Sequence, residues 1–256
     1  MLAPDLDLLK TAALEAGDIA RKYWREDPQV WDKGGDDPVS EADFAVDTHL
    51  KRSLLAARPD YGWVSEETED DPARFATTRA FVIDPIDGTR AFVAGEKTWA
   101  HSLAIVENGK PIVACVYLPV RDKLYLATMG GGATLNDAPI NAAVNQFDDE
   151  TTLLTPKVTL KPAFWKAAPP TFDRHFRPSI AYRLALVAEG RFDGMLTLRP
   201  SWEWDIAAGA LLVTEARGQA TDRRGKALTF NTPSRQSAGV VAAGNGVHAA
   251  LIDQLV

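Results

Sequence analysis

One short segment, Asp84 to Thr89, holds two carboxylates, a glycine and a hydroxyl. Asp84 and Asp87 would repel each other unless a cation lay between them, and Mg²⁺ prefers oxygen ligands of this kind. Gly88 allows the backbone to approach a ligand closely. If a helix begins near Thr89, its free N–H groups form a phosphate site, and the threonine hydroxyl can orient a water molecule. The segment therefore predicts metal-assisted phosphate chemistry, although Asp-Pro and Asp-Gly are also common in plain turns.

Three further acids occur in patterns that could serve the same site. Glu66 belongs to a Ser-Glu-Glu-Thr stretch that is typical of an acidic surface loop, but it shortly precedes the strand that ends at Asp84, and adjacent strand ends could bring the two together. Asp43 follows Ser40 by three positions and fits a capping box, yet it also shares a helix face with apolar residues, where a carboxylate needs a partner. Asp205 begins an apolar helix, either as its N-cap or as a metal ligand.

Hydrophobic periodicity predicts the elements that must position these acids. An amphipathic helix is expected over residues 5–24, and a second helix is expected to start at Ser40. Four strands are predicted next, at 79–83, 102–106, 112–117 and 124–128, and Asn108-Gly109 is a strong hairpin turn between the second and the third of these. After about residue 140, short strands alternate with helices. We therefore expect an α+β half over residues 1–140 and an α/β half over residues 141–256, with helices layered on sheets.

Composition limits the class of protein and its partners. The chain has 256 residues, of which 46% are hydrophobic and 25% charged, as in ordinary globular proteins with a sizeable core. The net charge is −7, without a Lys/Arg cluster, so we expect no nucleic-acid partner. A single cysteine, Cys115, fits a reducing compartment. No signal peptide and no apolar run of about 20 residues is evident, so we expect a cytoplasmic protein without a membrane segment.

Together these segments resemble the inositol monophosphatase superfamily. The resemblance spans nearly the whole chain and rests on four blocks in the same order, at residues 37–43, 65–67, 82–89 and 204–216. It implies a layered α-β-α-β-α sandwich of the inositol monophosphatase/fructose-1,6-bisphosphatase type, which combines α+β and α/β character. It also implies hydrolysis of a small-molecule phosphate monoester by water, with dependence on Mg²⁺ and sensitivity to Li⁺. Members of the family are often homodimers, so a homodimer is expected here.

The resemblance implies a set of ligands for two or three Mg²⁺ ions. Glu66, Asp84 and the carbonyl of Ile86 would hold one ion. Asp84, Asp87 and Asp205 would hold a second. A third and weaker ion could bind near Glu66 through water.

The remaining roles concern the attacking water and the phosphate. Thr89, hydrogen-bonded to Asp43, would orient the water, with Glu66 as a further catalytic residue. The backbone N–H groups of Gly88 and Thr89 would bind phosphate oxygens. Lys33 is similar to a family lysine near the weak metal, and the alternative is a solvated loop lysine.

The substrate stays open at this point. The family acts on inositol monophosphates, 3'-phosphoadenosine 5'-phosphate, fructose 1,6-bisphosphate and histidinol phosphate. Inositol-specific members carry a glutamate shortly before the Trp-Asp block, and residues 196–201 lack it, although Glu203 is near. Arg199 would instead suit an anionic group, and Arg183 and Asp87 are further candidates for substrate contact. The alternatives are an inositol monophosphatase-like enzyme, a 3'(2'),5'-bisphosphate nucleotidase, a histidinol-phosphate phosphatase and a non-catalytic relative that only binds a phosphorylated ligand.

Overall fold

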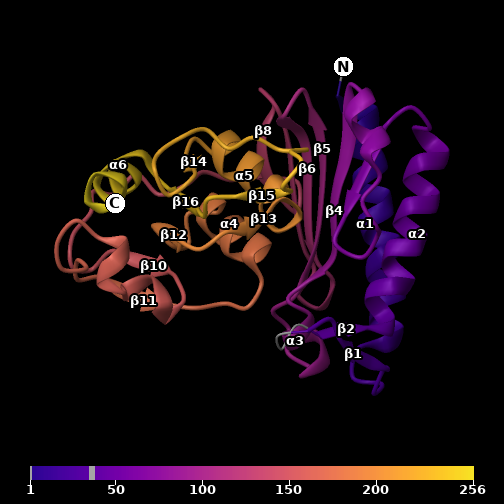
Figure 1. Cartoon of the computed structure of the whole chain (residues 1–256), viewed down its shortest axis with the longest axis horizontal. Coiled ribbons are helices and arrows are strands. Elements are labelled where there is room, and N and C mark those ends of the chain that lie inside the picture. The colour runs from indigo at the N-terminus through magenta and orange to yellow at the C-terminus, as the bar shows by residue number, and fades with distance from the viewer. Residues whose placement is uncertain (1, 35–37) are drawn as a thin grey trace.

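Helices and two large β-sheets alternate in layers across the molecule (Figure 1). The computed structural model of the chain describes residues 2–34 and 38–256. Helices α1 (Ala3–Tyr23) and α2 (Glu41–Ala57) cover one face of the first sheet. Helices α4 (Ile180–Ala188) and α5 (Glu203–Glu215) lie between the two sheets, and α6 (Asn245–Gln254) covers the outer face of the second sheet. The predicted α-β-α-β-α sandwich is confirmed.

The first sheet has seven strands, which follow one another in chain order from β3 to β9. Strand β3 runs parallel to β4, and every later pair is antiparallel. The strands are β3 (Gly62–Ser65), β4 (Arg79–Asp87), β5 (Ala100–Glu107), β6 (Lys110–Leu118), β7 (Lys123–Thr128), β8 (Gly132–Leu135) and β9 (Ala138–Pro139). Asn108 and Gly109 both have positive φ angles between β5 and β6, which confirms the predicted hairpin turn.

The second sheet has five strands in the order β11-β10-β12-β16-β14 and mixes parallel with antiparallel pairs. Its strands are β10 (Thr152–Leu154), β11 (Asp173–His175), β12 (Gly194–Thr197), β14 (Gln219–Thr221) and β16 (Val240–Ala243). Four short strands form two small antiparallel pairs, β1 (Val30–Asp32) with β2 (Pro38–Ser40) and β13 (Ser201–Trp202) with β15 (Gln236–Ser237). Helix α3 (Thr89–Val93) directly follows β4.

Apolar residues between the layers form the core. One cluster joins α1 and α2 to the first sheet, a second surrounds α4 and α5, and a third joins the second sheet to α6. Helices α4 and α5 approach closely at Gly209, where a Cβ atom would lie 2.4 Å from the Cβ of Leu184. A larger residue there would push the two helices apart, and α5 carries one of the candidate site residues.

Sequence reasoning placed most elements but missed several small ones. The predicted long helices and the predicted strands of both sheets are present, whereas β1, β2, β3, β8, β9, β11, β13 and β15 were not predicted. The block at residues 37–43 begins at Asp37, which lies outside the described residues. The division at residue 140 falls between the last strand of the first sheet and the first strand of the second, and it stays a prediction. Among the described residues, no helix is long and apolar enough to cross a membrane.

Candidate active site

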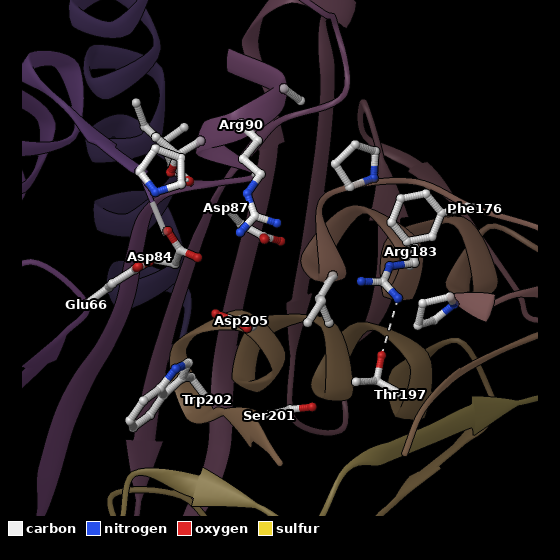
Figure 2. A pocket seen from close by; sticks show the side chains of 18 of the residues that line it. Glu66, Asp84, Asp87, Arg90, Phe176, Arg183, Thr197, Ser201, Trp202 and Asp205 are labelled. Atoms are coloured by element: carbon white, nitrogen blue, oxygen red, sulfur yellow. Dashed lines mark hydrogen bonds between the residues drawn. The ribbon is translucent and has the colours of Figure 1, made fainter. Parts of the chain in front are cut away.

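A bulge in β4 brings Asp84 and Asp87 to the same side of the sheet. Asp84 pairs with Ser102 of β5 and Asp87 pairs with Ala100, so three steps along β4 match two steps along β5. In a regular strand, residues three apart point to opposite faces, and one extra residue reverses that relation. Both carboxylates accordingly line a single pocket (Figure 2).

Glu66 reaches this pocket because β3 and β4 are parallel neighbours. Strand β3 ends one residue before Glu66, and the Glu66 N–H donates to the carbonyl of Ile83 at 3.3 Å. Asp47 of α2 holds the turn in place, since its two carboxylate oxygens accept from Ser65 Oγ at 2.5 Å and from Thr68 Oγ1 at 2.7 Å. Sequence reasoning missed Asp47, whose partners are remote in the chain.

Asp205 comes from the other half of the molecule. Ser102 Oγ donates to the carbonyl of Trp204 at 2.8 Å and ties the first turn of α5 to β5. One carboxylate oxygen each of Glu66, Asp84 and Asp205 lies within 4.8 Å of the others. Asp205 is the third residue of α5, and Trp202 occupies the N-cap position, so the alternative of Asp205 as N-cap is wrong.

Asp84 is the buried member of the carboxylate cluster, whereas Glu66 and Asp205 are half-buried. Asp84 is 2% exposed, and its Oδ1 has no hydrogen-bond partner among the described residues. Burial raises the pKa of Asp84 well above its usual range, and the charges of Glu66, Asp87 and Asp205 raise it further. A bound cation would relieve both effects, because it would replace the lost water and oppose the repulsion.

Asp87 is held from the α4 side. Its Oδ2 accepts from Ser179 Oγ at 2.6 Å and from the N–H of Ala181 at 2.5 Å. Ser179 is also the N-cap of α4, accepting from the N–H of Tyr182 at 2.9 Å. Burial raises the pKa of Asp87 to about 6, although these hydrogen bonds oppose the shift. Sequence reasoning missed Ser179, since nothing local links it to Asp87.

Thr89 and Asp43 meet across the site. Gly88 adopts a left-handed conformation with φ 98°, which turns the chain from β4 into α3 and places Thr89 at the first helical position. Thr89 Oγ1 lies 3.1 Å from Asp43 Oδ1 and 3.1 Å from the carbonyl of Ile86. Asp43 Oδ2 accepts from the N–H of Ser40 at 2.8 Å, which confirms the capping box. Burial raises the pKa of Asp43 to about 6.

Lys33 reaches the edge of the cluster. Its ammonium group donates to Glu66 Oε1 at 3.0 Å and to Glu67 Oε1 at 2.6 Å. Burial alone lowers the pKa of Lys33, but the two glutamates raise it well above its usual value. Lys33 is thus an exposed loop lysine whose ammonium group is paired with two glutamates, and its role near a metal stays a prediction.

The pocket has a volume of about 740 Å³ and extends from the carboxylates to the second sheet. Arg183 and Arg199, the predicted substrate contacts, line it, together with Trp202, which sequence reasoning missed. Glu203 does not line it. That side chain is fully buried, and its carboxylate accepts from the N–H of Asn231 at 2.6 Å and from Thr232 Oγ1 at 2.5 Å. Glu203 therefore anchors a loop behind the pocket wall.

Comparison with known proteins agrees with this geometry. The Inositol monophosphatase family model matches residues 1–256. The chain is 33% identical over 239 residues to an inositol-1-monophosphatase of Rhizobium meliloti (strain 1021), covering 86% of each chain. It is 30% identical over 263 residues to a histidinol-phosphatase of Chlorobaculum parvum, covering 98% of this chain and 96% of the relative. A solved structure of an IMPase from Thermotoga maritima matches with a TM-score of 0.84 and 28% identity over 99% of this chain and 96% of the other. The chain belongs to the inositol monophosphatase family.

Proposed function

We propose that the protein is a Mg²⁺-dependent phosphate monoester hydrolase that acts on a small molecule. The observation that carries the proposal is the meeting of Glu66, Asp84 and Asp205 within 4.8 Å, beside the hydroxyl–carboxylate pair of Thr89 and Asp43. The cluster supplies oxygen ligands for a cation, and the pair supplies a hydroxyl for a water molecule.

The residues fit Mg²⁺. The cluster offers carboxylate oxygens as ligands, and Asp84 Oδ1, which has no hydrogen-bond partner among the described residues, provides a buried ligand atom that a cation would satisfy. Glu66, Asp84 and the carbonyl of Ile86 would hold one ion, and Asp84, Asp87 and Asp205 would hold a second. When bound, such ions neutralise the phosphate, polarise the attacking water and stabilise the leaving alkoxide.

The protein's own groups position the water and the phosphate. While Thr89 Oγ1 donates its hydrogen to Asp43, its lone pairs can accept a hydrogen bond from the water. Asp43 is suited to this task because its pKa of about 6 keeps it largely ionised at neutral pH while leaving it basic enough to attract the proton. The N–H groups of Gly88 and Thr89 stand at the start of α3 and would bind phosphate oxygens. Lys33 would act at the outer edge of the cluster, through Glu66, where a third ion could bind.

The test is phosphate release from inositol 1-phosphate, histidinol phosphate, 3'-phosphoadenosine 5'-phosphate and fructose 1,6-bisphosphate, with and without Mg²⁺. We expect Mg²⁺-dependent turnover of at least one compound and its loss in Asp87→Asn. The matched control is Asp60→Asn, which changes the same functional group at an exposed position. Absence of Mg²⁺-dependent turnover on all four compounds would refute the proposal, and binding without turnover would favour the non-catalytic relative.

A further inference from the structure

Resting on the proposed function, we infer that Arg183, Thr197 and Arg199 form a site for a second phosphate group on the substrate. The substrate class is then a bisphosphorylated small molecule, one phosphate lying at the carboxylate cluster and the other on the α4–β12 wall. Figure 2 shows Arg183 and Thr197 on the side of the pocket opposite Glu66 and Asp84.

Arg183 is a buried guanidinium group held in a fixed position. It comes from α4, is only 4% exposed and lines the pocket. Its Nε donates to the carbonyl of Ser179 at 3.3 Å, and its Nη1 donates to Thr197 Oγ1 at 3.2 Å. The ring of Phe176 lies 5.4 Å from the guanidinium carbon. Arginine binds phosphate through paired N–H groups in a fixed plane, and the fixed position lowers the entropy lost on binding.

Arg199 supplies a second cation on the same wall. It follows β12 by two residues, is exposed and lines the pocket. Its side chain makes no hydrogen bond or ion pair with any residue in the part of the chain that the structure describes. The side chain is therefore available to a ligand.

The charges of the two arginines would lack local compensation once a metal is bound. Burial lowers the pKa of Arg183 to about 10, Asp87 and Asp205 oppose that shift, and the neighbouring charge of Arg199 adds to it. Those two carboxylates are proposed ligands of the metal, whose charge would offset theirs in the loaded site. The wall would then carry two neighbouring guanidinium groups without carboxylates to compensate them, which an anion between the groups would correct.

The two arginines would favour some of the family's substrates over others. The ring hydroxyls of an inositol monophosphate are neutral and gain little from two guanidinium groups. The amino group of histidinol phosphate is cationic and would be repelled. A second phosphate, in contrast, can accept several charge-assisted hydrogen bonds.

Matched substrate pairs test the inference. Fructose 1-phosphate is compared with fructose 1,6-bisphosphate, and adenosine 3'-phosphate with adenosine 3',5'-bisphosphate, each at saturating Mg²⁺. We expect kcat/KM to be at least about tenfold higher for the bisphosphate in one pair, the value of about one charge-assisted hydrogen bond. Arg199→Gln should reduce that ratio by about tenfold, and Arg199→Lys should reduce it less. The control Arg224→Gln removes the same charge at an exposed position outside the pocket and should leave the ratio unchanged.

The outcomes separate the inference from the proposed function. Turnover without preference in either pair, or an equal loss on both members of a pair in Arg199→Gln, overturns the second-phosphate site and leaves the phosphatase standing. Turnover of inositol 1-phosphate or histidinol phosphate, but of neither bisphosphate, also overturns the second-phosphate site and leaves the phosphatase standing. If none of these six compounds is hydrolysed, the phosphatase proposal fails. Binding of the same compounds measured by calorimetry with Mg²⁺ then decides the inference, since equal affinity within both pairs overturns it.

Discussion

Replacing Asp84 by asparagine should stabilise the metal-free protein. The nearest carboxylate oxygens of Glu66, Asp84 and Asp205 lie within 4.8 Å of one another, and two unit charges at that separation repel by about 3 kcal/mol at an effective dielectric constant of about 20. Asp84 takes part in two of these pairs. The substitution keeps the size of the side chain, removes the buried charge and lets the new amide donate a hydrogen bond to a neighbouring carboxylate.

Protonation of Asp84 in the parent protein limits the stability that Asp84→Asn can gain. A buried carboxyl group can bind a proton instead of remaining charged, at a cost of about 1.4 kcal/mol for each pH unit above its ordinary pKa of 3.8. At pH 8 this limit is about 6 kcal/mol, so we expect Asp84→Asn to gain about 3 to 6 kcal/mol without metal. For a chain of this size, 1 kcal/mol corresponds to about 2 to 4 °C in Tm, and the variant should therefore melt at least about 5 °C higher.

Thermal unfolding in EDTA at pH 8 measures the effect, with Asp60→Asn as the exposed control. Adding Mg²⁺ should narrow the difference in Tm, because a ligand at 100 times its Kd stabilises the parent by about 2.7 kcal/mol while the variant has lost a shared ligand. A variant that melts below the parent in EDTA would refute the reasoning, since Asp84 would then stabilise the fold without a cation.

The same logic gives the pH dependence of the metal-free protein. Burial raises the pKa of Asp43 and Asp87 from 3.8 to about 6 in the folded state. A raised pKa means that the folded chain binds these protons more tightly than the unfolded chain does, so the stabilisation is complete below pH 4 and is lost as the pH rises through 6. Each group accounts for about 3 kcal/mol at neutral pH. Unfolding free energies in EDTA should therefore fall between pH 4 and 7, and saturating Mg²⁺ should flatten this slope.

Two further predictions concern the groups around the carboxylates. Thr89→Ala should lower kcat by about a hundredfold or more with little change in KM, because it removes the hydroxyl proposed to orient the water. Thr89→Ser keeps a hydroxyl and should retain most of the activity. Equal rates for the two variants would contradict this role. Ser179→Ala should lower the free energy of unfolding by about 1 kcal/mol, because α4 loses its N-cap. It should also shift the acid limb of the pH–rate profile to higher pH, because Asp87 loses a hydrogen bond that favours its charged form. An unchanged acid limb would show that Ser179 serves the helix alone.

The elements predicted from the sequence were those with a strong local signal. The long helices show a period of 3.6, and the hairpin between β5 and β6 carries Asn-Gly at its turn. Strand β3 was missed because its four residues are all buried, so it lacks the alternation that reveals a strand. Its position matters, since the parallel pairing of β3 with β4 brings Glu66 to the pocket.

The part of the candidate site that lies within one short segment could be predicted from the sequence. The segment from Asp84 to Thr89 combines the bulge, the left-handed glycine and the helix start within six residues, so one motif carries several constraints. The residues that support the site could not be predicted, because Asp47 accepts from side chains 18 and 21 positions away and Ser179 donates to a side chain 92 positions away. Tertiary contacts of this kind leave no periodic signal in the sequence.

Glu203 shows how proximity in sequence misleads about the substrate wall. It lies two residues before Asp205, yet a helix turns about 100° per residue, so neighbours on α5 face different directions. Asp205 faces the pocket, whereas Glu203 faces the loop at Asn231 and Thr232. The wall is instead built from Arg183 on α4 and from Arg199 after β12, two elements that become neighbours only when the layers assemble. The proposed metal ligands follow from a motif, whereas the proposed substrate preference depends on the packing of α4 against the second sheet, and this is why the arginine pair has to be tested as a unit.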